Sequence, residues 1–181
     1  YGASKIAAYY ITKTYRDSYG LFASNGILFN HEGQLRSNNF VTRKITQSLA
    51  RIKVGLQSKL SLGNIEAKRD WSHSMDMVRG MDMILNYHQP DDFVLASGES
   101  HSVKEFLQIA CDWFDLKIDD VLEIDKTCFR PKDIEYLSGD SSKAKKELNW
   151  KPEISFEELV NKMCKYDLAL ALNKDTTGLV F

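Results

Sequence analysis

The chain has 181 residues, enough for one domain with a sizeable hydrophobic core. Its 24 basic and 25 acidic residues give a formal net charge of −1, so we expect no nucleic-acid-binding surface and no broad membrane-binding field. No apolar run approaches the roughly 18 residues of a membrane span. The three cysteines are far apart and show no metal-ligand spacing, which favours reduced thiols, a cytoplasmic protein and no metal site.

The first 19 residues have helical periodicity, and Gly20 is a plausible end of that helix. Tyr1 and Lys5 are four positions apart, which places them on one helix face. An ammonium beside a phenol favours the phenolate, a group that can take a proton from an alcohol or sugar hydroxyl. The alternative is that both residues are exposed on a helix surface and have no catalytic role. A chain that opens on Tyr inside an uncapped helix also suggests that an amino-terminal portion is missing.

The segment 21–30 contains a short apolar run typical of a buried parallel strand, and the segment 30–39 is polar and predicts a loop. Asn30, His31 and Glu32 follow the apolar run directly. Ligands of open α/β sheets bind beyond the carboxyl ends of strands, so these three residues could hold a cofactor or a sugar. They could equally form a polar loop that caps the sheet.

The rest of the chain predicts strands alternating with helices. Ser102 with Glu105, and Ser155 with Glu158, have the spacing of capping boxes that open helices. The further expected elements are helices over 40–55, 75–85, 102–114, 140–148 and 155–173, and strands over 59–62 and 92–96. This alternation predicts an α/β fold with parallel pairing, and the second half looks like a smaller lobe at the edge of the sheet.

Several basic residues lie in or near predicted loops, where guanidinium and ammonium groups could grip a nucleotide diphosphate. Arg69 and Arg130 are the best candidates, because each stands in an apolar or rigid context in which a charge needs a partner. The alternative for most basic residues is a solvated surface charge. No Gly-rich phosphate-binding loop occurs anywhere in the chain. The whole set of basic candidates is Arg36, Arg43, Lys44, Arg69 and Arg130.

Seven stretches resemble the extended short-chain dehydrogenase/reductase superfamily and, within it, the carboxy-terminal half of the GDP-mannose 4,6-dehydratase family. The Tyr-x-x-x-Lys motif marks only the superfamily, whereas the stretches 25–32 and 39–45 are far more specific. The seven stretches are Tyr1-Gly-Ala-Ser-Lys5, Asn25-Gly-Ile-Leu-Phe-Asn-His-Glu32, Asn39-Phe-Val-Thr-Arg-Lys-Ile45, Leu62-Gly-Asn64, Lys68-Arg-Asp-Trp71, Phe129-Arg-Pro131 and Leu148-Asn-Trp-Lys-Pro152.

The resemblance implies the latter part of a Rossmann-type parallel sheet plus a smaller α/β substrate-binding lobe. It places the end of the NADP-binding portion, interleaved with lobe segments, in 1–100, and mainly the lobe and terminal helices in 101–181. It implies a homo-oligomer, a dimer or tetramer, that acts on GDP-mannose with NADP in GDP-fucose biosynthesis. The implied product is GDP-4-keto-6-deoxymannose, formed by internal hydride transfer from C4 to C6 of the sugar.

The resemblance also implies residue roles. Tyr1 would be the acid/base and Lys5 would bond the nicotinamide ribose, so both would also touch the cofactor, together with His31 and Arg36. Gly63 would lie close to the nucleotide, and Arg69 and Arg130 would bind the diphosphate. The full implied GDP-mannose site is Asn30, Val41, Lys44, Gly63, Arg69, Arg130 and Glu135.

The chain departs from the family pattern in two respects. Gly33-Gln-Leu-Arg-Ser37 stands where the family usually has Ser-Pro-Arg-Arg-Gly, in a loop that reaches a neighbouring subunit's cofactor. The Gly-rich loop and the Thr and Glu that assist elimination belong to the amino-terminal half, so we expect this chain alone to be inactive. The alternatives are another sugar-nucleotide dehydratase or epimerase, and a catalytically dead GDP-sugar-binding subunit.

Overall fold

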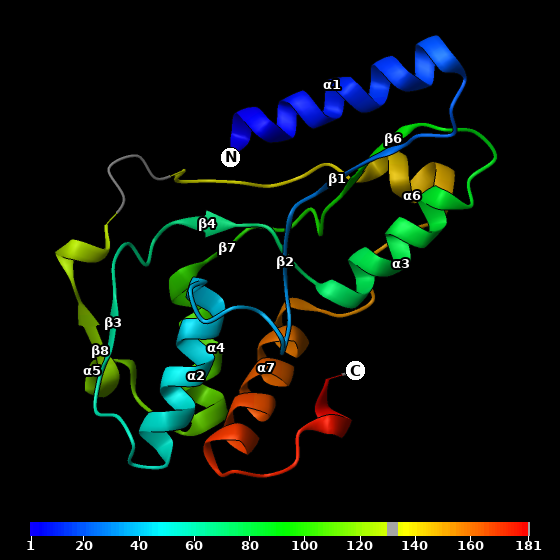
Figure 1. The fold of residues 1–181 in the computed structure, drawn as a ribbon. Helices are drawn as coiled ribbons and strands as arrows, with labels where there is room; N and C mark the ends of the chain where they lie inside the picture. The colour runs from blue at the N-terminus through cyan, green and yellow to red at the C-terminus, as the bar shows by residue number, and fades with distance from the viewer. Residues whose placement is uncertain (130–133, 181) are drawn as a thin grey trace.

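The computed structural model describes residues 1–129 and 134–180. Figure 1 shows α2, α4 and α7 grouped beside short strands, with α1 lying across one end of the molecule. The helices are α1 (Gly2–Tyr19), α2 (Val41–Lys53), α3 (Ser74–Leu85), α4 (Val103–Phe114), α5 (Ile118–Val121), α6 (Ser142–Leu148) and α7 (Phe156–Ala171), with 3-10 turns η1 (Lys126–Cys128) and η2 (Thr177–Leu179).

Within the described residues the strands form four two-stranded pairs, three of them parallel. The parallel pairs are β1 (Asn25–Leu28) with β6 (Asp92–Leu95), β2 (Asn30–Glu32) with β5 (Trp71–His73), and β3 (Leu60–Leu62) with β8 (Leu122–Ile124). The antiparallel pair is β4 (Lys68–Arg69) with β7 (His101–Ser102). Parallel pairs joined through helices confirm the predicted α/β class.

Two hydrophobic clusters form the core. The larger one lies where α2, α4 and α7 pack against one another, around Leu49, Phe106 and Val160. The smaller one joins α3, β6 and α6 around Phe93 and Trp150, whose indole donates to the Asp76 carbonyl at 2.9 Å. Each cluster contains residues from both sides of position 100. The division of the chain into a cofactor-binding portion, 1–100, and a substrate-binding lobe, 101–181, stays a prediction.

The helix boundaries follow local signals. Ser102 and Glu105 form the predicted capping box, and Gly20 ends α1 in the left-handed conformation that glycine adopts without steric cost. Ser155 caps α7 as predicted, because its side chain accepts from the Glu158 amide. The reciprocal bond of a capping box is not shown, and Glu158 Oε1 instead lies 3.8 Å from Nζ of Lys162. None of the helices in the described part of the chain is long and apolar enough to span a bilayer.

The structure corrects several predictions about strands. Asn30–Glu32 is strand β2 rather than the start of a loop, because its backbone pairs with β5. Strand β1 is partly exposed rather than buried, with Ile27 open to solvent. The strands β4, β5, β7 and β8 were not predicted, because two or three residues carry no detectable periodicity.

Candidate functional site

A cavity of about 410 Å³ lies between the start of α2, the end of β3 and the strands β4 and β5. Its floor includes Trp71, which is buried and stacks on Phe156 of α7 with the ring centroids 5.9 Å apart. The remaining lining is Asn30, Glu32, Asn39, Phe40, Val41, Lys44, Leu62, Gly63, Asn64, Ala67, Arg69, Val103 and Cys128.

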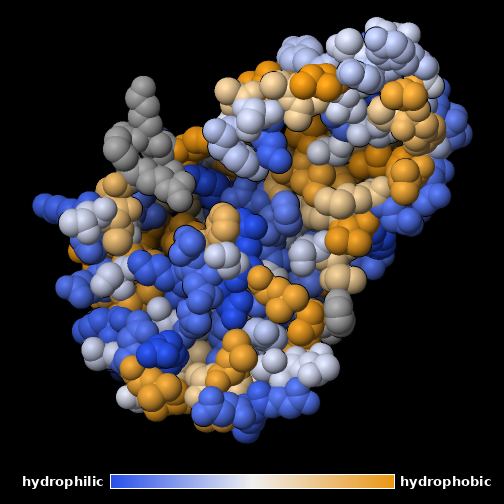
Figure 2. All heavy atoms as spheres, in the orientation of Figure 1, coloured by the Kyte–Doolittle hydropathy of each residue, from blue (hydrophilic) through white to orange (hydrophobic). Residues whose placement is uncertain are grey.

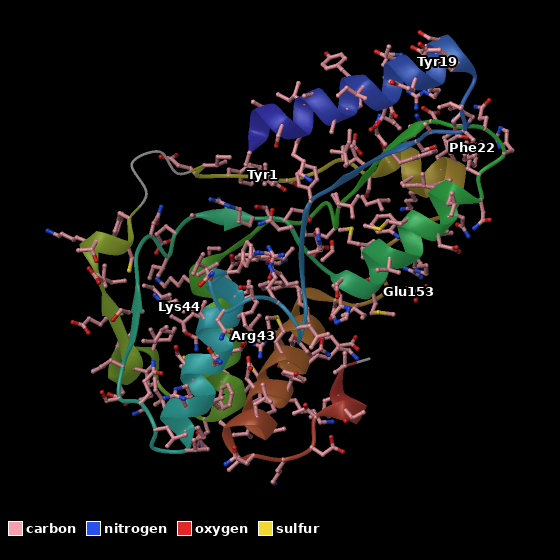
Figure 3. All side chains as sticks on the ribbon, in the orientation of Figure 1. Tyr1, Tyr19, Phe22, Arg43, Lys44 and Glu153 are labelled. Carbon is pink, nitrogen blue, oxygen red and sulfur yellow. The ribbon has the colours of Figure 1, made fainter. Side chains whose placement is uncertain are left out.

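Lys44 supplies a positive charge to this cavity from the first turn of α2. Among the residues that the structure describes, no carboxylate lies within ion-pairing distance of its ammonium. Figure 3 shows Lys44 and Arg43 on different sides of α2, with Arg43 on the side of α7. An unpaired, half-buried ammonium in a cavity suits an anionic ligand.

Arg69 supplies a second positive charge, and its position is fixed by backbone contacts. Its Nη1 donates to the carbonyl of Ile134 and, at 2.8 Å, to that of Lys68. Lys68 in turn pairs with the segment 135–137: its amide donates to the Glu135 carbonyl at 2.8 Å, and its carbonyl accepts from the Leu137 amide at 3.2 Å. Glu135 is thus tied to the strand that carries Arg69, although it does not line the cavity.

Asp70, the next residue, holds this region together. Its carboxylate is fully buried and accepts hydrogen bonds from Ser97, Gly98 and Gly139 at 2.6–3.0 Å. Three separate segments therefore meet at one carboxylate, which fixes the backbone between Arg69 and Trp71.

Glu32 is the acidic group of the cavity and is satisfied within the protein. Its Oε2 accepts from the Thr42 hydroxyl at 2.6 Å and lies 3.2 Å from Nε of Arg36. Burial raises the pKa of Glu32 above its usual value, and Thr42 and Arg36 offset part of that rise. The other two charged side chains of the cavity lining, Lys44 and Arg69, are both basic.

Gly63 lines the cavity at the end of β3, where the backbone of β3 and that of η1 approach each other closely. A Cβ on Gly63 would lie 2.7 Å from the carbonyl oxygen of Cys128 in η1. Any larger residue would push η1 away from β3, so only glycine allows this approach.

Tyr1 and Lys5 lie on α1, outside the cavity. The Lys5 ammonium sits over the Tyr1 ring, 5.3 Å from its centroid, so the two side chains share one face as their spacing predicts. The Tyr1 side chain is 95 % exposed. Figure 3 shows Tyr1 at the free end of α1.

Polar contacts attach α1 to the rest of the described structure. Arg16 donates to the Ala23 carbonyl at 3.2 Å, and most of the other contacts meet at one carboxylate. Asp92, on β6, accepts from Arg16 at 2.8 and 3.0 Å and from the Tyr9 hydroxyl at 3.0 Å. Asn25 of β1 adds two further donors to it. Arg16 holds the pKa of Asp92 well below its usual range, which keeps this anchor charged.

His31 and Arg36, the other expected cofactor contacts, lie outside the cavity lining. His31 Nδ1 lies 2.9 Å from the Phe29 carbonyl, which can only accept, so Nδ1 carries a proton; in the neutral ring Nε2 is then an acceptor. The Arg36 guanidinium stacks on the Phe40 ring at 3.4 Å and pairs with Glu32. Arg36 therefore contacts two residues that line the cavity without lining it itself.

The structure brings together five of the seven substrate residues implied by the sequence: Asn30, Val41, Lys44, Gly63 and Arg69. Glu135 joins them only through its backbone, and Arg130 lies outside the described residues. Glu32, Asn39, Phe40, Leu62, Asn64 and Trp71 stood inside the recognised motifs and could have been included. Nothing in the sequence marked Ala67, Val103 or Cys128, which only the fold places there.

The arrangement suits a ligand that is anionic and partly apolar. Lys44 and Arg69 can bind phosphate oxygens, and the amides of Asn30, Asn39 and Asn64 can bond hydroxyl groups. The described residues contain no group of three or more His, Cys, Asp or Glu side chains arranged to hold a metal ion. A second, more open hollow beside α7 and η2 contains none of the expected site residues.

The family model described as GDP-mannose 4,6 dehydratase matches residues 1–163. The chain is 55 % identical over 171 residues to "GDP-mannose 4,6 dehydratase 1" of Arabidopsis thaliana, covering 94 % of this chain and 47 % of that protein. It is 43 % identical to the human GDP-mannose 4,6 dehydratase, covering 94 % of this chain and 50 % of that protein. The chain thus spans about half the length of these curated relatives.

Solved structures show the same fold. The structure of RMD from Pseudomonas aeruginosa complexed with NADPH superimposes with a TM-score of 0.87 at 22 % identity, covering 94 % of this chain and 56 % of that one. A dTDP-glucose 4,6-dehydratase from Bacillus anthracis, in complex with NAD, gives a TM-score of 0.78 at 19 % identity, covering 92 % and 51 %. These likenesses confirm the expected architecture, the latter part of a Rossmann-type sheet with a smaller lobe.

Proposed function

The chain belongs to the GDP-mannose 4,6-dehydratase family, and from this premise we propose that it forms the carboxy-terminal half of an enzyme that converts GDP-mannose to GDP-4-keto-6-deoxymannose. The observation that carries the proposal is the cavity, because residues assigned to GDP-mannose from the family motifs line one space. Lys44 and Arg69 then bind the diphosphate, and Asn30 bonds the sugar.

Tyr1 takes the proton from the sugar 4-hydroxyl, and the Lys5 ammonium lies over its ring. NADP would supply the hydride acceptor for C4 and the hydride donor for C6, and water would be lost across C5–C6 between the two transfers. His31 fits a nicotinamide cofactor because its Nε2 remains an acceptor, and Lys5 fits the ribose hydroxyls as a donor. Arg36 is the weakest of the cofactor assignments, since it is already paired with Glu32 and Phe40.

We further propose a cytoplasmic enzyme that works as a homo-oligomer, a dimer or tetramer, and supplies GDP-fucose biosynthesis. The isolated chain is expected to be inactive because it contains no Gly-rich phosphate loop. Another sugar-nucleotide dehydratase or epimerase is not favoured, because the plant and human relatives both carry the GDP-mannose 4,6 dehydratase name. A catalytically dead binding subunit would bind GDP-mannose without turning it over.

The first test is calorimetric titration of the chain with GDP-mannose, with UDP-glucose as the competing ligand class. Arg69→Gln should weaken GDP-mannose binding by about 1.5–3 kcal/mol, the usual range for a hydrogen bond to a charged group. Arg51→Gln is the matched control, because Arg51 is an exposed arginine of α2 that bonds only Gln57 among the described residues. Equal affinities for the two variants would contradict the diphosphate assignment.

A further inference from the structure

A buried ion pair joins α2 to α7 behind the cavity, and the proposed function does not use it. Nε of Arg43 lies 2.9 Å from both carboxylate oxygens of Asp167, and Nη2 lies 2.8 Å from Oδ1. The Thr46 hydroxyl donates to Asp167 Oδ2 at 2.6 Å. Arg43 is 6 % exposed and Asp167 is 2 % exposed, so the pair is closed to solvent.

The other end of the Arg43 guanidinium holds the loop between β2 and α2. Its Nη1 donates to the carbonyl of Gln34 and, at 2.9 Å, to that of Arg36. One side chain therefore connects a carboxylate on α7 to two carbonyls of the loop turn at 33–36. Lysine could not replace these contacts, because a single ammonium lacks the planar fork that reaches both sides at once.

This loop is continuous with a wall of the cavity. Asn39 and Phe40 end it, Val41 begins α2, and all three line the cavity with Lys44. Arg36 stacks on Phe40, so a displacement of the loop carries the Phe40 ring with it. The loop is also tied to the C-terminal segment, since Gln34 Nε2 donates to the Leu179 carbonyl at 3.0 Å.

We propose that Arg43 is a positioning residue for the nucleotide-sugar site: oriented by Asp167, it fixes the loop 33–40 and the first turn of α2 so that Phe40 and Lys44 face the ligand. The inference rests on the proposed function for the identity of the ligand. Fold stability alone does not require the pair, because a buried ion pair can often be replaced by apolar residues at little cost. Its contacts with two loop carbonyls give it a task that an apolar pair could not perform.

The test compares two arginine variants at a temperature well below unfolding. Arg43→Lys should weaken GDP-mannose binding at least tenfold and speed amide hydrogen exchange in residues 33–40. Arg79→Lys is the matched control, because Arg79 pairs with the buried Asp76 at 2.8 Å, next to the smaller hydrophobic cluster, and does not line the cavity. It should lower the melting temperature but leave both GDP-mannose affinity and exchange in the loop unchanged.

If Arg43→Lys does not fold, Asp167→Asn replaces it in the test. This change keeps the shape of the side chain and removes only the charge that orients Arg43. It should weaken binding by a smaller factor, about threefold. Affinity within twofold of wild type, in whichever variant folds, would overturn the proposal. A wild-type chain that does not bind GDP-mannose would instead contradict the proposed function. Amide exchange in residues 33–40 would then test the positioning role by itself. Faster exchange in Arg43→Lys than in Arg79→Lys would support that role, and equal exchange would refute it.

Discussion

Arg43 and Lys44 are consecutive residues of α2 with opposite environments. Successive side chains of a helix point about 100° apart, so one faces α7 and the other faces the cavity (Figure 3). The buried guanidinium is satisfied by Asp167 and two carbonyls, whereas the ammonium has no carboxylate partner in the described structure. At this scale, exposure and partners separate a structural cation from a ligand-binding one, although both are basic residues of one motif.

His73 is a second residue whose environment decides its chemistry. It is buried at the N-terminus of α3, where Nδ1 accepts from the Met75 amide at 3.1 Å and Nε2 lies 3.2 Å from Gln34 Oε1. His73 therefore caps α3 from a buried position. Burial lowers the pKa of His73, with a smaller contribution from Lys162.

We therefore expect His73 to make folding pH-dependent. Both states are neutral at this residue above about pH 6.5, and below it the unfolded chain binds a proton more readily than the folded one. As the pH is lowered, the free energy of unfolding should fall by about 1.4 kcal/mol for each pH unit over which His73 is protonated only in the unfolded chain. Urea unfolding at pH 7.5 and 5.5 measures this, with His73→Asn as the comparison because asparagine keeps a capping oxygen. The variant should lose less stability than wild type between the two pH values, and equal losses would refute the assignment.

At the scale of elements, α1 differs from every other helix of more than two turns in the described structure. None of its residues is buried, whereas α2, α3, α4 and α7 each bury one face. Ile6, Ile11 and Tyr15 are exposed on it, and Figure 2 shows apolar surface in the region of α1 and β1. Packing therefore contributes little to the placement of α1. Polar contacts set it, mainly those of Asp92 with Arg16 and Tyr9.

Asp92→Asn should loosen α1 as a unit. Losing the charge-assisted bonds to Arg16 should lower the opening free energy of the helix by about 1.5–3 kcal/mol, so amide exchange over residues 2–19 should accelerate about tenfold to a hundredfold. Asp91→Asn is the control, since Asp91 pairs with Lys143 at 2.7 Å instead. Hydrogen exchange measured by mass spectrometry should show the change in α1 and not in α7. If α1 exchanges equally fast in the two variants, Asp92 is not its anchor.

At the scale of the whole molecule, the two parts of the proposed machinery are separate. The cavity is lined by residues of α2, α4, β2, β3, β4, β5 and η1, whereas Tyr1 and Lys5 lie at the start of α1, outside its lining. The relatives are about twice as long as this chain. We expect substrate binding to reside in this chain and turnover to require the remaining half as well.

A chimera tests this expectation by placing the amino-terminal half of the Arabidopsis relative before Tyr1. The chimera should form GDP-4-keto-6-deoxymannose, detected by mass spectrometry, and the isolated chain should not. Tyr1→Phe in the chimera should reduce turnover by about 10²–10⁴-fold, the usual contribution of general acid–base catalysis, without weakening GDP-mannose binding. Tyr10→Phe, an exposed tyrosine of the same helix, should have no effect. Full turnover by Tyr1→Phe would remove Tyr1 from the mechanism.

The sequence by itself determined the features that arise from near neighbours along the chain. The predicted starts of α4 and α7 are confirmed because Ser102 and Ser155 cap them within three residues, and Tyr1 and Lys5 share a face because helix geometry fixes that spacing. The motif residues Asn30, Val41, Lys44, Gly63 and Arg69 could also be named from the sequence. Their roles in binding remain predictions.

Only the tertiary structure decided the features that depend on distant residues. Strands such as β4 and β7 are two residues long and exist because Lys68 meets Ser102 and Arg69 meets His101, which no local pattern reveals. Arg43 is buried rather than ligand-facing because Asp167, 124 positions away, lies opposite it. Side chains that follow local geometry can be read from a sequence, whereas a cavity and a buried ion pair are contacts between separate segments and exist only once the chain has folded.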